Sequence, residues 1–165
     1  MTEGLRDGIA ALVPRLRRFA YVLTGNREEG DDLVQTACMK ALDRQEQFHP
    51  GTRLDAWMFQ IVRNQFLDER RRLARRGTPA GGDALDLVSD EGRAAAAAED
   101  RLRLARVRTA VAALPVEQRE VLALVAIEGR SYREAADVLS LPIGTVMSRL
   151  SRARARLHAF EEEGL

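Results

Sequence analysis

Near the end of the chain, small and basic side chains recur at the spacing of one helix face. If residues 143–157 form a helix, a rotation of about 100° per residue turns its apolar stripe inward and leaves five residues facing out. They are Gly144, Ser148, Ser151, Arg152 and Ala155. Small side chains let the backbone approach a base edge closely, and a guanidinium group can pair with guanine in the major groove. Three flanking arginines, whose side chains suit phosphate oxygens, are Arg149, Arg154 and Arg156. The pattern predicts a DNA-reading helix.

The residues before that helix complete a helix-turn-helix. Ser131 and Glu134 have the spacing of a capping box for a short helix over residues 131–139. A tight turn over residues 140–144 follows, and in this motif the second helix enters the major groove. Residues 130–158 hold six arginines against two acids, net +4. A helical hairpin with arginines on its solvated face is also common in small helical proteins, so this segment alone leaves a purely structural role open.

Side chains that could support catalysis or bind a metal are sparse. No pair of carboxylates has a spacing typical of a cleft, and there is no glycine-rich phosphate loop. His49 and His158 have no nucleophile near them in sequence, and the single cysteine, Cys38, cannot form an internal disulfide. We therefore expect no enzymatic activity, no metal and no cofactor. Cys38 is interpreted as a small core residue.

The overall charge is nearly balanced, but it is segregated along the chain. The 165 residues include 26 basic and 25 acidic side chains, with 45% apolar residues, a composition typical of a folded protein. Residues 63–76 carry net +4, residues 26–46 net −3 and residues 77–100 net −5. Near-neutrality is therefore no argument against DNA binding. Because no apolar run approaches the length of a membrane span and no signal peptide is recognisable, we expect a cytoplasmic protein without membrane insertion.

Helical periodicity extends through almost the whole sequence. Apolar residues recur at steps of three and four, and no segment alternates as a strand would, so the predicted fold class is all-α. Pro14 should kink the first helix or mark its start, and Thr52 should cap the third. We expect two small helical domains joined by a flexible acidic linker. The boundaries are residues 1–76, 77–100 and 101–165, with the helix-turn-helix in the last.

Several strings of residues point to one protein family. Residues 31–36 (DDLVQT), 56–64 (AWMFQIVRN), 114–120 (LPVEQRE) and 141–154 (LPIGTVMSRLSRAR) occur in this order. They resemble bacterial sigma factors of the extracytoplasmic-function (ECF) class, in a minimal two-domain form and with features of the general-stress branch. The resemblance implies a factor that binds core RNA polymerase and directs transcription initiation without chemistry of its own. It further implies that the first domain docks on the polymerase and reads the minus 10 element, while the second reads the minus 35 element as duplex DNA. It also implies control by an anti-sigma factor, which we expect between the two domains, and a stress-response regulon.

The same resemblance assigns roles to particular residues. Those for polymerase docking are Asp31, Asp32 and Gln35. Those for the minus 10 element are Phe48 and Asn64, which would receive an unstacked base, with Arg70, Arg71 and Arg72 as positive charge for the single strand. Those for base contacts at the minus 35 element are Met147, Ser148, Ser151 and Arg152, of which three agree with the helix-face argument. Bland interpretations remain open: an ordinary solvated face for the docking helix, a hydrophobic plug for Phe48, and backbone hydrogen bonding for Asn64.

A different class of protein also fits part of the pattern. A two-domain repressor or activator could use the same helix-turn-helix, with residues 1–76 as a sensor or dimerisation bundle. Such a regulator would bind duplex DNA stably by itself. A sigma factor would instead need core polymerase and would initiate transcription in a purified system.

Overall fold

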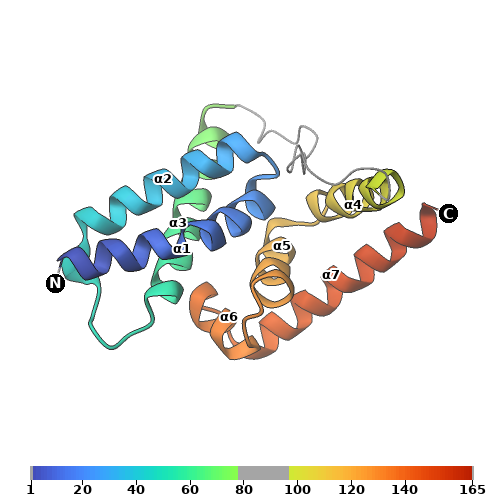
Figure 1. Ribbon diagram of the computed structural model, residues 1–165. Helices are drawn as coiled ribbons and strands as arrows, with labels where there is room; N and C mark the ends of the chain where they lie inside the picture. Colours follow the sequence, from blue (N-terminus) through green and yellow to red (C-terminus); the bar gives the residue numbers. More distant parts are fainter. Residues whose placement is uncertain (1, 78–96, 165) are drawn as a thin grey trace.

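The computed structural model describes residues 2–77 and 97–164, and the regular elements of this part are all helical (Figure 1). The first half of the chain forms a three-helix bundle with a short 3-10 helix before its last member. These elements are α1 (Thr2–Thr24), α2 (Arg27–Asp43), η1 (Gln45–Gln47) and α3 (Leu54–Arg75). Large side chains from all three long helices are fully buried, and Phe19 of α1 meets Phe59 of α3 edge to face at 5.2 Å. The all-α prediction is confirmed for the described residues.

Short polar and glycine signals set the junction between α1 and α2. Gly25 adopts a φ of +70°, a left-handed conformation that suits glycine and ends α1. Asn26 follows as the N-cap of α2, and its side-chain oxygen accepts a hydrogen bond from the backbone N–H of Glu29 at 3.1 Å. The two helices therefore reverse direction within two residues and pack side by side.

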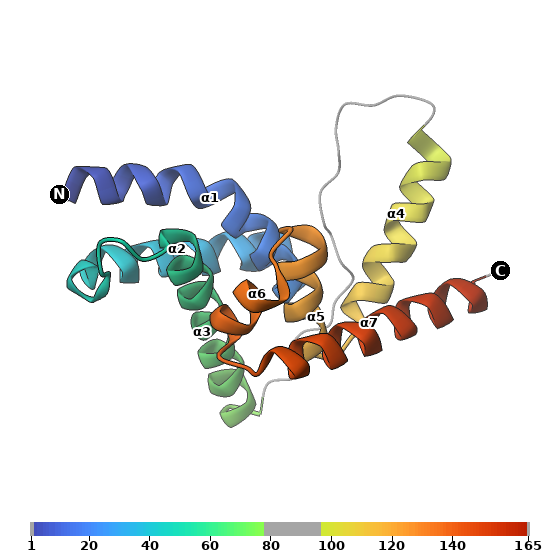
Figure 2. The same cartoon turned by 90° about the horizontal axis from the view of Figure 1, so that it is seen from below.

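Pro14 lies inside α1 rather than at its start. The helix runs without a break from Thr2 to Thr24, and Figure 2 shows that it changes direction part-way along. A proline ring lacks the N–H that would close the helical hydrogen bond and displaces the preceding turn, so a bend is the expected result. Of the two outcomes predicted for Pro14, the kink is the correct one.

The prediction that Thr52 caps α3 is wrong. The helix begins at Leu54, its N-cap position is Arg53, and no side chain caps it. The hydroxyl of Thr52 instead donates to the carbonyl of His49 at 2.6 Å. That bond closes the turn around Gly51, whose φ is +93°, so the hydroxyl is already engaged before the helix starts.

The second half of the chain contains four α-helices and a short π-helix. They are α4 (Ala97–Ala112), α5 (Val116–Leu122), η2 (Ala123–Ile127), α6 (Tyr132–Leu139) and α7 (Ile143–Glu163). The single helix expected over residues 115–129 is thus divided, because its last turn widens into the π-helix η2. Residues 97–100, expected in the linker, belong to α4, and the rest of the predicted acidic linker, residues 78–96, lies outside the described part of the chain.

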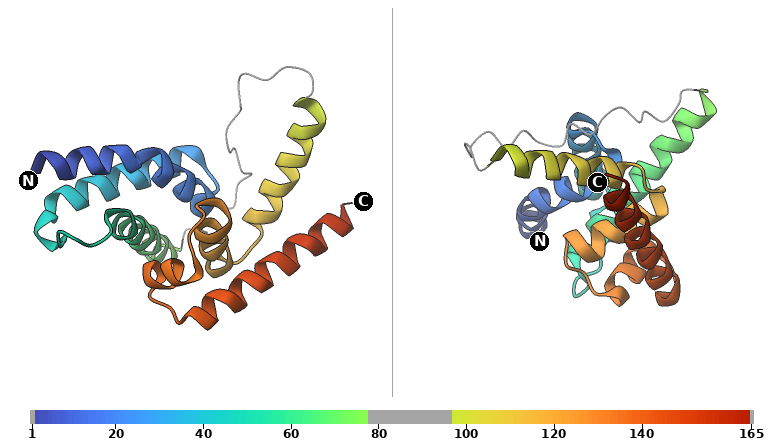
Figure 3. Two further views of the ribbon diagram at one scale, coloured as in Figure 1. Left: turned by 60° about the horizontal axis from the view of Figure 1, so that its bottom comes forward. Right: turned by 90° about the vertical axis from the view of Figure 1, so that its right-hand side faces the viewer.

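Helix α4 projects from the body of the molecule. Figure 3 shows α4 and the last part of α7 diverging from the point where they meet. Near that point Ala110 is buried, whereas Leu102, Leu104 and Val107 are exposed along the projecting part. Three large apolar side chains on one exposed helix are unusual for a surface without a binding partner.

The two halves of the molecule pack directly on one another. Helix α1 contacts α5 and η2, and α3 contacts α6 (Figure 1). Buried apolar residues of both halves form one continuous cluster. Among the described residues, no helix is long and apolar enough to cross a membrane.

Candidate nucleic-acid interface

Local backbone signals build the helix-turn-helix as predicted. The hydroxyl of Ser131 accepts a hydrogen bond from the N–H of Glu134 at 3.1 Å and caps α6. The helix ends at Ser140, which has a left-handed conformation with φ 53° and ψ 46°. The N–H of Leu141 returns to the carbonyl of Ala136 at 3.0 Å, and α7 begins after Pro142. The turn is therefore fixed by its own hydrogen bonds and sets the direction of α7.

One face of α7 is anchored and the opposite face is free of contacts with the rest of the fold. The anchoring residues are Val146, Leu150 and Ala153, all buried. The exposed residues include those predicted to read bases: Met147, Ser148, Ser151 and Arg152. Within residues 2–77 and 97–164, Arg152 makes no ion pair, so its guanidinium group is available to a ligand. This surface has the chemistry required for contact with the edges of base pairs.

Gly144 marks the start of this exposed face. A Cβ atom added there would have no heavy atom within 4 Å, and the residue has an ordinary helical conformation. The fold itself therefore does not require glycine at this position. The missing side chain does let a bound surface come close to the first turn of α7.

The three flanking arginines differ in their surroundings. Arg154 and Arg156 are exposed and, in the described part of the chain, make no ion pair. Arg149 is half-buried, and its charge is close enough to Glu120 of α5 to lower the pKa of that carboxyl. Two of the three thus resemble free phosphate contacts, while Arg149 also interacts with its own domain.

In the first domain, Phe48 and Asn64 lie along one stripe of α3. Phe48 packs on Trp57 in a tilted ring pair with centroids 5.2 Å apart, and both rings are half-buried. Trp57, Ile61 and Asn64 are spaced at steps of four and three, so they share a helix face. Asn64 is exposed and has no hydrogen-bond partner among the described residues, which removes the interpretation that it satisfies backbone groups.

The arginines at the end of α3 are not equivalent. Arg70 is half-buried, with its guanidinium carbon 5.5 Å from the centre of the Phe66 ring. Arg71 is exposed and pairs with Asp68 at 3.3 Å. Arg72 is exposed and makes no ion pair within the residues that the structure describes. The positive end of α3 therefore presents Arg72 most freely, whereas Arg70 is held against the bundle.

The predicted docking residues on α2 also divide into two groups. Asp31 accepts a hydrogen bond from the Tyr21 hydroxyl at 2.5 Å and pairs with Arg17 at 3.4 Å, so its carboxylate joins α2 to α1. Asp32 and Gln35 are exposed. Helical spacing continues their stripe to Met39, whose side chain is 60% exposed.

Sequence reasoning gave no role to the two charged residues buried between the domains. Arg119 of α5 donates from Nη1 to the carbonyl of Leu23 in α1 at 3.0 Å. Its neighbour Glu120 is 1% exposed and pairs with Arg63 of α3 at 3.1 Å. Burial raises the pKa of Glu120 and lowers the pKa of Arg119, while Arg63 opposes the shift at Glu120. The available signal was an opposite-charge pair inside an apolar helix pattern.

The fold and this surface define a class: a two-domain helical protein that presents a helix-turn-helix to DNA. The first domain, over residues 9–76, matches the family described as Sigma-70 region 2. The second, over residues 104–157, matches Sigma-70, region 4. Within the residues that the structure describes, no group of three or more His, Cys, Asp or Glu residues could hold a metal ion.

Comparison with known proteins identifies the family. The ECF RNA polymerase sigma factor EcfG of Rhodopseudomonas palustris is 42% identical over 160 residues, 96% of this chain and 86% of the relative. The sigma factor RpoE of Bartonella quintana, solved in complex with the anti-sigma factor NepR, has a TM-score of 0.78 at 31% identity. That match covers 97% of this chain and 98% of the other. CnrH, solved with the cytosolic domain of CnrY, has a TM-score of 0.72 at 29% identity and covers 99% of this chain and 90% of the other. The chain belongs to the ECF family of RNA polymerase sigma factors, and it is not an enzyme.

Proposed function

We propose that this sigma factor reads the minus 10 element with residues 1–76 and the minus 35 element with residues 101–165, joined by the segment over residues 77–100. The single observation that carries the proposal is the exposed face of α7, whose small side chains and unpaired Arg152 stand on a fixed helix-turn-helix. A helix with this pattern can enter the major groove without rearrangement of its own domain.

At the minus 35 element, the proposed base contacts come from the exposed face of α7. Arg152 is assigned to guanine through a bidentate pair, and Ser148 and Ser151 to shorter polar contacts. Met147 can make only apolar contact, for which a thymine methyl group is the suitable partner. Arg154 and Arg156 are assigned to phosphates, and Arg149 contributes there from its half-buried position.

At the minus 10 element, we assign Asn64 to the edge of an extruded base and Phe48 to stacking. Support comes from the exposure of Asn64 and from its place on the same helix stripe as Trp57, the ring on which Phe48 packs. An aromatic ring can hold any unstacked base, and an amide can read its edge. Arg71 and Arg72, with the less accessible Arg70, supply positive charge for the single strand.

Docking on core RNA polymerase is assigned to the outer face of α2. Asp32 and Gln35 are the polar contacts, and the exposed side chain of Met39 extends the same stripe. Asp31 is assigned mainly to holding α2 against α1, because its carboxylate is already shared between Tyr21 and Arg17.

Control by an anti-sigma factor is proposed from two observations. A relative that covers 98% of its length with this chain was solved in complex with an anti-sigma factor. The exposed apolar residues of α4, Leu102, Leu104 and Val107, would suit an apolar helix of a protein partner. We also propose a cytoplasmic location and a stress-response regulon. An antagonist placed between the two domains, as first expected, would have to separate surfaces that are here in direct contact.

The experiment that tests the proposal compares DNA binding with and without core polymerase. Labelled duplex containing an upstream promoter element is mixed with the protein alone, with core polymerase alone, and with both. A sigma factor should give a sequence-specific complex only in the third mixture. Stable specific binding by the protein alone, with no effect of added polymerase, would favour the two-domain regulator instead.

A further inference from the structure

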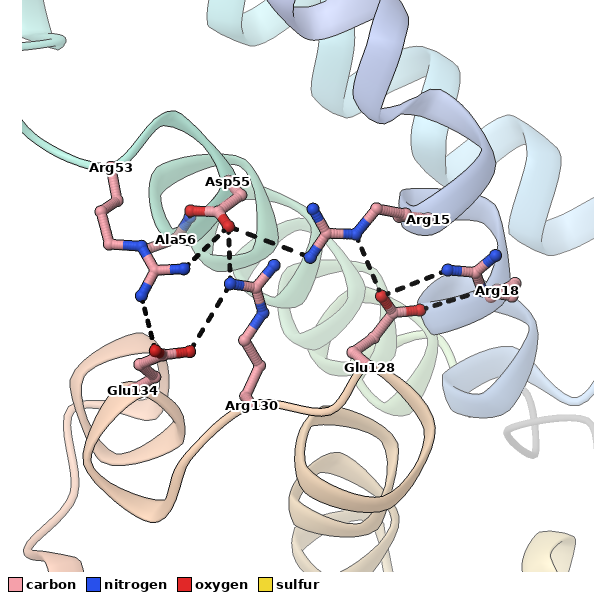
Figure 4. A network of polar contacts seen from close by, with 8 residues as sticks. All are labelled: Arg15, Arg18, Arg53, Asp55, Ala56, Glu128, Arg130 and Glu134. Carbon is pink, nitrogen blue, oxygen red and sulfur yellow. Dashed lines mark hydrogen bonds and ion pairs between the residues drawn. The ribbon is translucent and has the colours of Figure 1, made fainter.

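The contact between the two domains is built largely from charged side chains. Figure 4 shows arginines of α1 and of the residues before α3 facing carboxylates and an arginine of the second domain. We call this set the interdomain charge network. Its members in the first domain are Arg15, Arg18, Arg53 and Asp55, and those in the second are Glu128, Arg130 and Glu134.

The centre of the network nearest α1 is Glu128, whose side chain is 1% exposed. Nε of Arg15 lies 3.3 Å from one carboxylate oxygen and Nε of Arg18 lies 3.2 Å from the other. The π-helix η2 positions this residue, because the N–H of Glu128 bonds to the carbonyl of Ala123 five residues back. A carboxylate that would be solvated on a separate domain is thus buried against α1 of the other.

The second centre joins the start of α3 to α6. Arg130, with a side chain 9% exposed, lies 2.6 Å from Asp55 and 3.5 Å from Glu134. Arg53 bridges the same two carboxylates, at 3.1 Å and 2.8 Å. Arg15 connects this centre to Glu128, since its Nη2 lies 3.9 Å from Asp55.

The network also rests on the core of the first domain. The guanidinium groups of Arg15 and Arg130, one from each domain, lie 5.6 Å and 5.4 Å from the centre of the Phe59 ring. The charges on the two sides are complementary, net +2 on the first domain and net −1 on the second. Closure therefore combines matched charge with cation–π contact on a shared ring.

This closed arrangement is too short to read both promoter elements. Positions minus 10 and minus 35 are about 25 base pairs apart, which is about 85 Å of straight duplex at about 3.4 Å per base pair. Helices α3, α6 and α7 contain 22, 8 and 21 residues, so even end to end they would measure about 75 Å. Because Asn64 and Arg152 lie near the middle of α3 and α7, their actual separation is well below that limit.

We propose that the interdomain charge network holds the free protein in an autoinhibited closed conformation, and that core polymerase must open it. The inference rests on the proposed function, because the inhibition consists in keeping two DNA-reading surfaces too close together. Both reading surfaces remain exposed in the closed form. Inhibition thus acts on the spacing of the domains and leaves each surface intact.

The test measures the distance between the domains in the isolated protein. In a Cys38→Ala background, cysteines introduced at the exposed positions Gln47 and His158 carry a donor and an acceptor dye for single-molecule energy transfer. The parent protein should give one population of high transfer efficiency. Glu128→Gln, which removes the buried charge but keeps the shape, should add a population of low efficiency.

Two further variants make the result specific. Arg18→Gln alters a half-exposed partner of Glu128, so it should fold normally and open the protein if Glu128→Gln proves unstable. Glu3→Gln makes the same chemical change at an exposed site on α1 outside the network and should leave the parent distribution unchanged. If opening raises the competent fraction from about one tenth to about one half, the apparent affinity for core polymerase should rise about fivefold.

Several results would overturn the proposal. A broad, low-efficiency distribution in the isolated parent protein would show that the network does not keep it closed. Parent-like distributions in both network variants would show that these charges are not what holds it. Opening without a gain in polymerase affinity would refute the autoinhibitory role, whereas failure of the parent protein to bind polymerase at all would refute the proposed function instead.

Discussion

Replacement of Arg152 by alanine should erase the preference for one base pair in the minus 35 element. Arg152 is exposed on α7 and makes no ion pair within the described residues. The helix is anchored on its other face by Val146, Leu150 and Ala153. Truncation of Arg152 should therefore change the free energy of unfolding by no more than about 0.5 kcal/mol. Any larger effect on promoter binding then reports contact with DNA.

The size of the effect follows from the kind of contact. A bidentate pair between a guanidinium group and guanine contributes about 1–3 kcal/mol of discrimination, which is about 5- to 150-fold in affinity. The loss should appear at a single base pair, because one side chain spans one base edge. Binding to elements that already carry another base there should change much less.

The assay is competition among duplexes that carry every single substitution in the upstream element, bound by reconstituted holoenzyme. Arg154→Ala is the matched control, because Arg154 is exposed on the flank of α7 and assigned to a phosphate. That variant should weaken all sequences about equally and reduce the salt dependence by about one counterion. If Arg152→Ala also weakens every sequence equally, Arg152 is a phosphate contact and the assignment of the reading face is wrong.

Three other substitutions test separate parts of the account. Gly144→Ala should leave the melting temperature unchanged, because the added Cβ meets no heavy atom within 4 Å, but should weaken duplex binding by holoenzyme; unchanged binding would show that close approach is not needed there. Asn64→Ala should leave stability unchanged and reduce open complexes by about 1–3 kcal/mol at promoters with one preferred minus 10 base, measured by permanganate footprinting; an equal loss at all promoters would argue against base reading. Because burial raises the pKa of Glu120 above its ordinary 4.5, the folded state binds this proton more tightly. Its stabilising effect is complete below the unfolded pKa and is lost as pH rises through the folded one. Denaturation of the parent and of Glu120→Gln across pH should show this, and a difference that does not vary with pH would contradict it.

The helices and the helix-turn-helix could be predicted because their signals are local. Ser131 and Glu134 lie three residues apart, and their hydrogen bond forms whatever the rest of the chain does. The face of α7 follows from the same logic, since Val146 and Leu150 fix its rotation against the domain. Thr52 shows the limit, because two local hydrogen bonds competed for one hydroxyl and the turn to His49 won.

The packing of one domain on the other could not be predicted from sequence patterns. Periodicity treats a charged residue as solvated, yet Glu128, Arg130 and Glu120 are buried by partners 57 to 113 residues away in the chain. The π-helix η2 is likewise set by that contact, since no local residue demands the extra residue in its turn. The expectation of an antagonist between the domains failed to anticipate this direct contact.

The remaining assignments stay predictions, but the structure changes their order of interest. Asp31 and Arg70 are engaged within the first domain, whereas Asp32, Gln35 and Arg72 are more accessible. Met39 was not singled out by sequence, because one exposed methionine in an amphipathic pattern carries no signal until the burial of its neighbours is known.

Transcription in a purified system tests the central claim most directly. Core RNA polymerase, the protein and a library of promoter fragments are combined, and the 5′ ends of the transcripts are mapped. The account predicts specific start sites that depend on the protein, with two conserved sequence blocks at fixed distances upstream. Start sites that are unchanged by the protein, or a protein that only blocks transcription by binding duplex DNA alone, would contradict it.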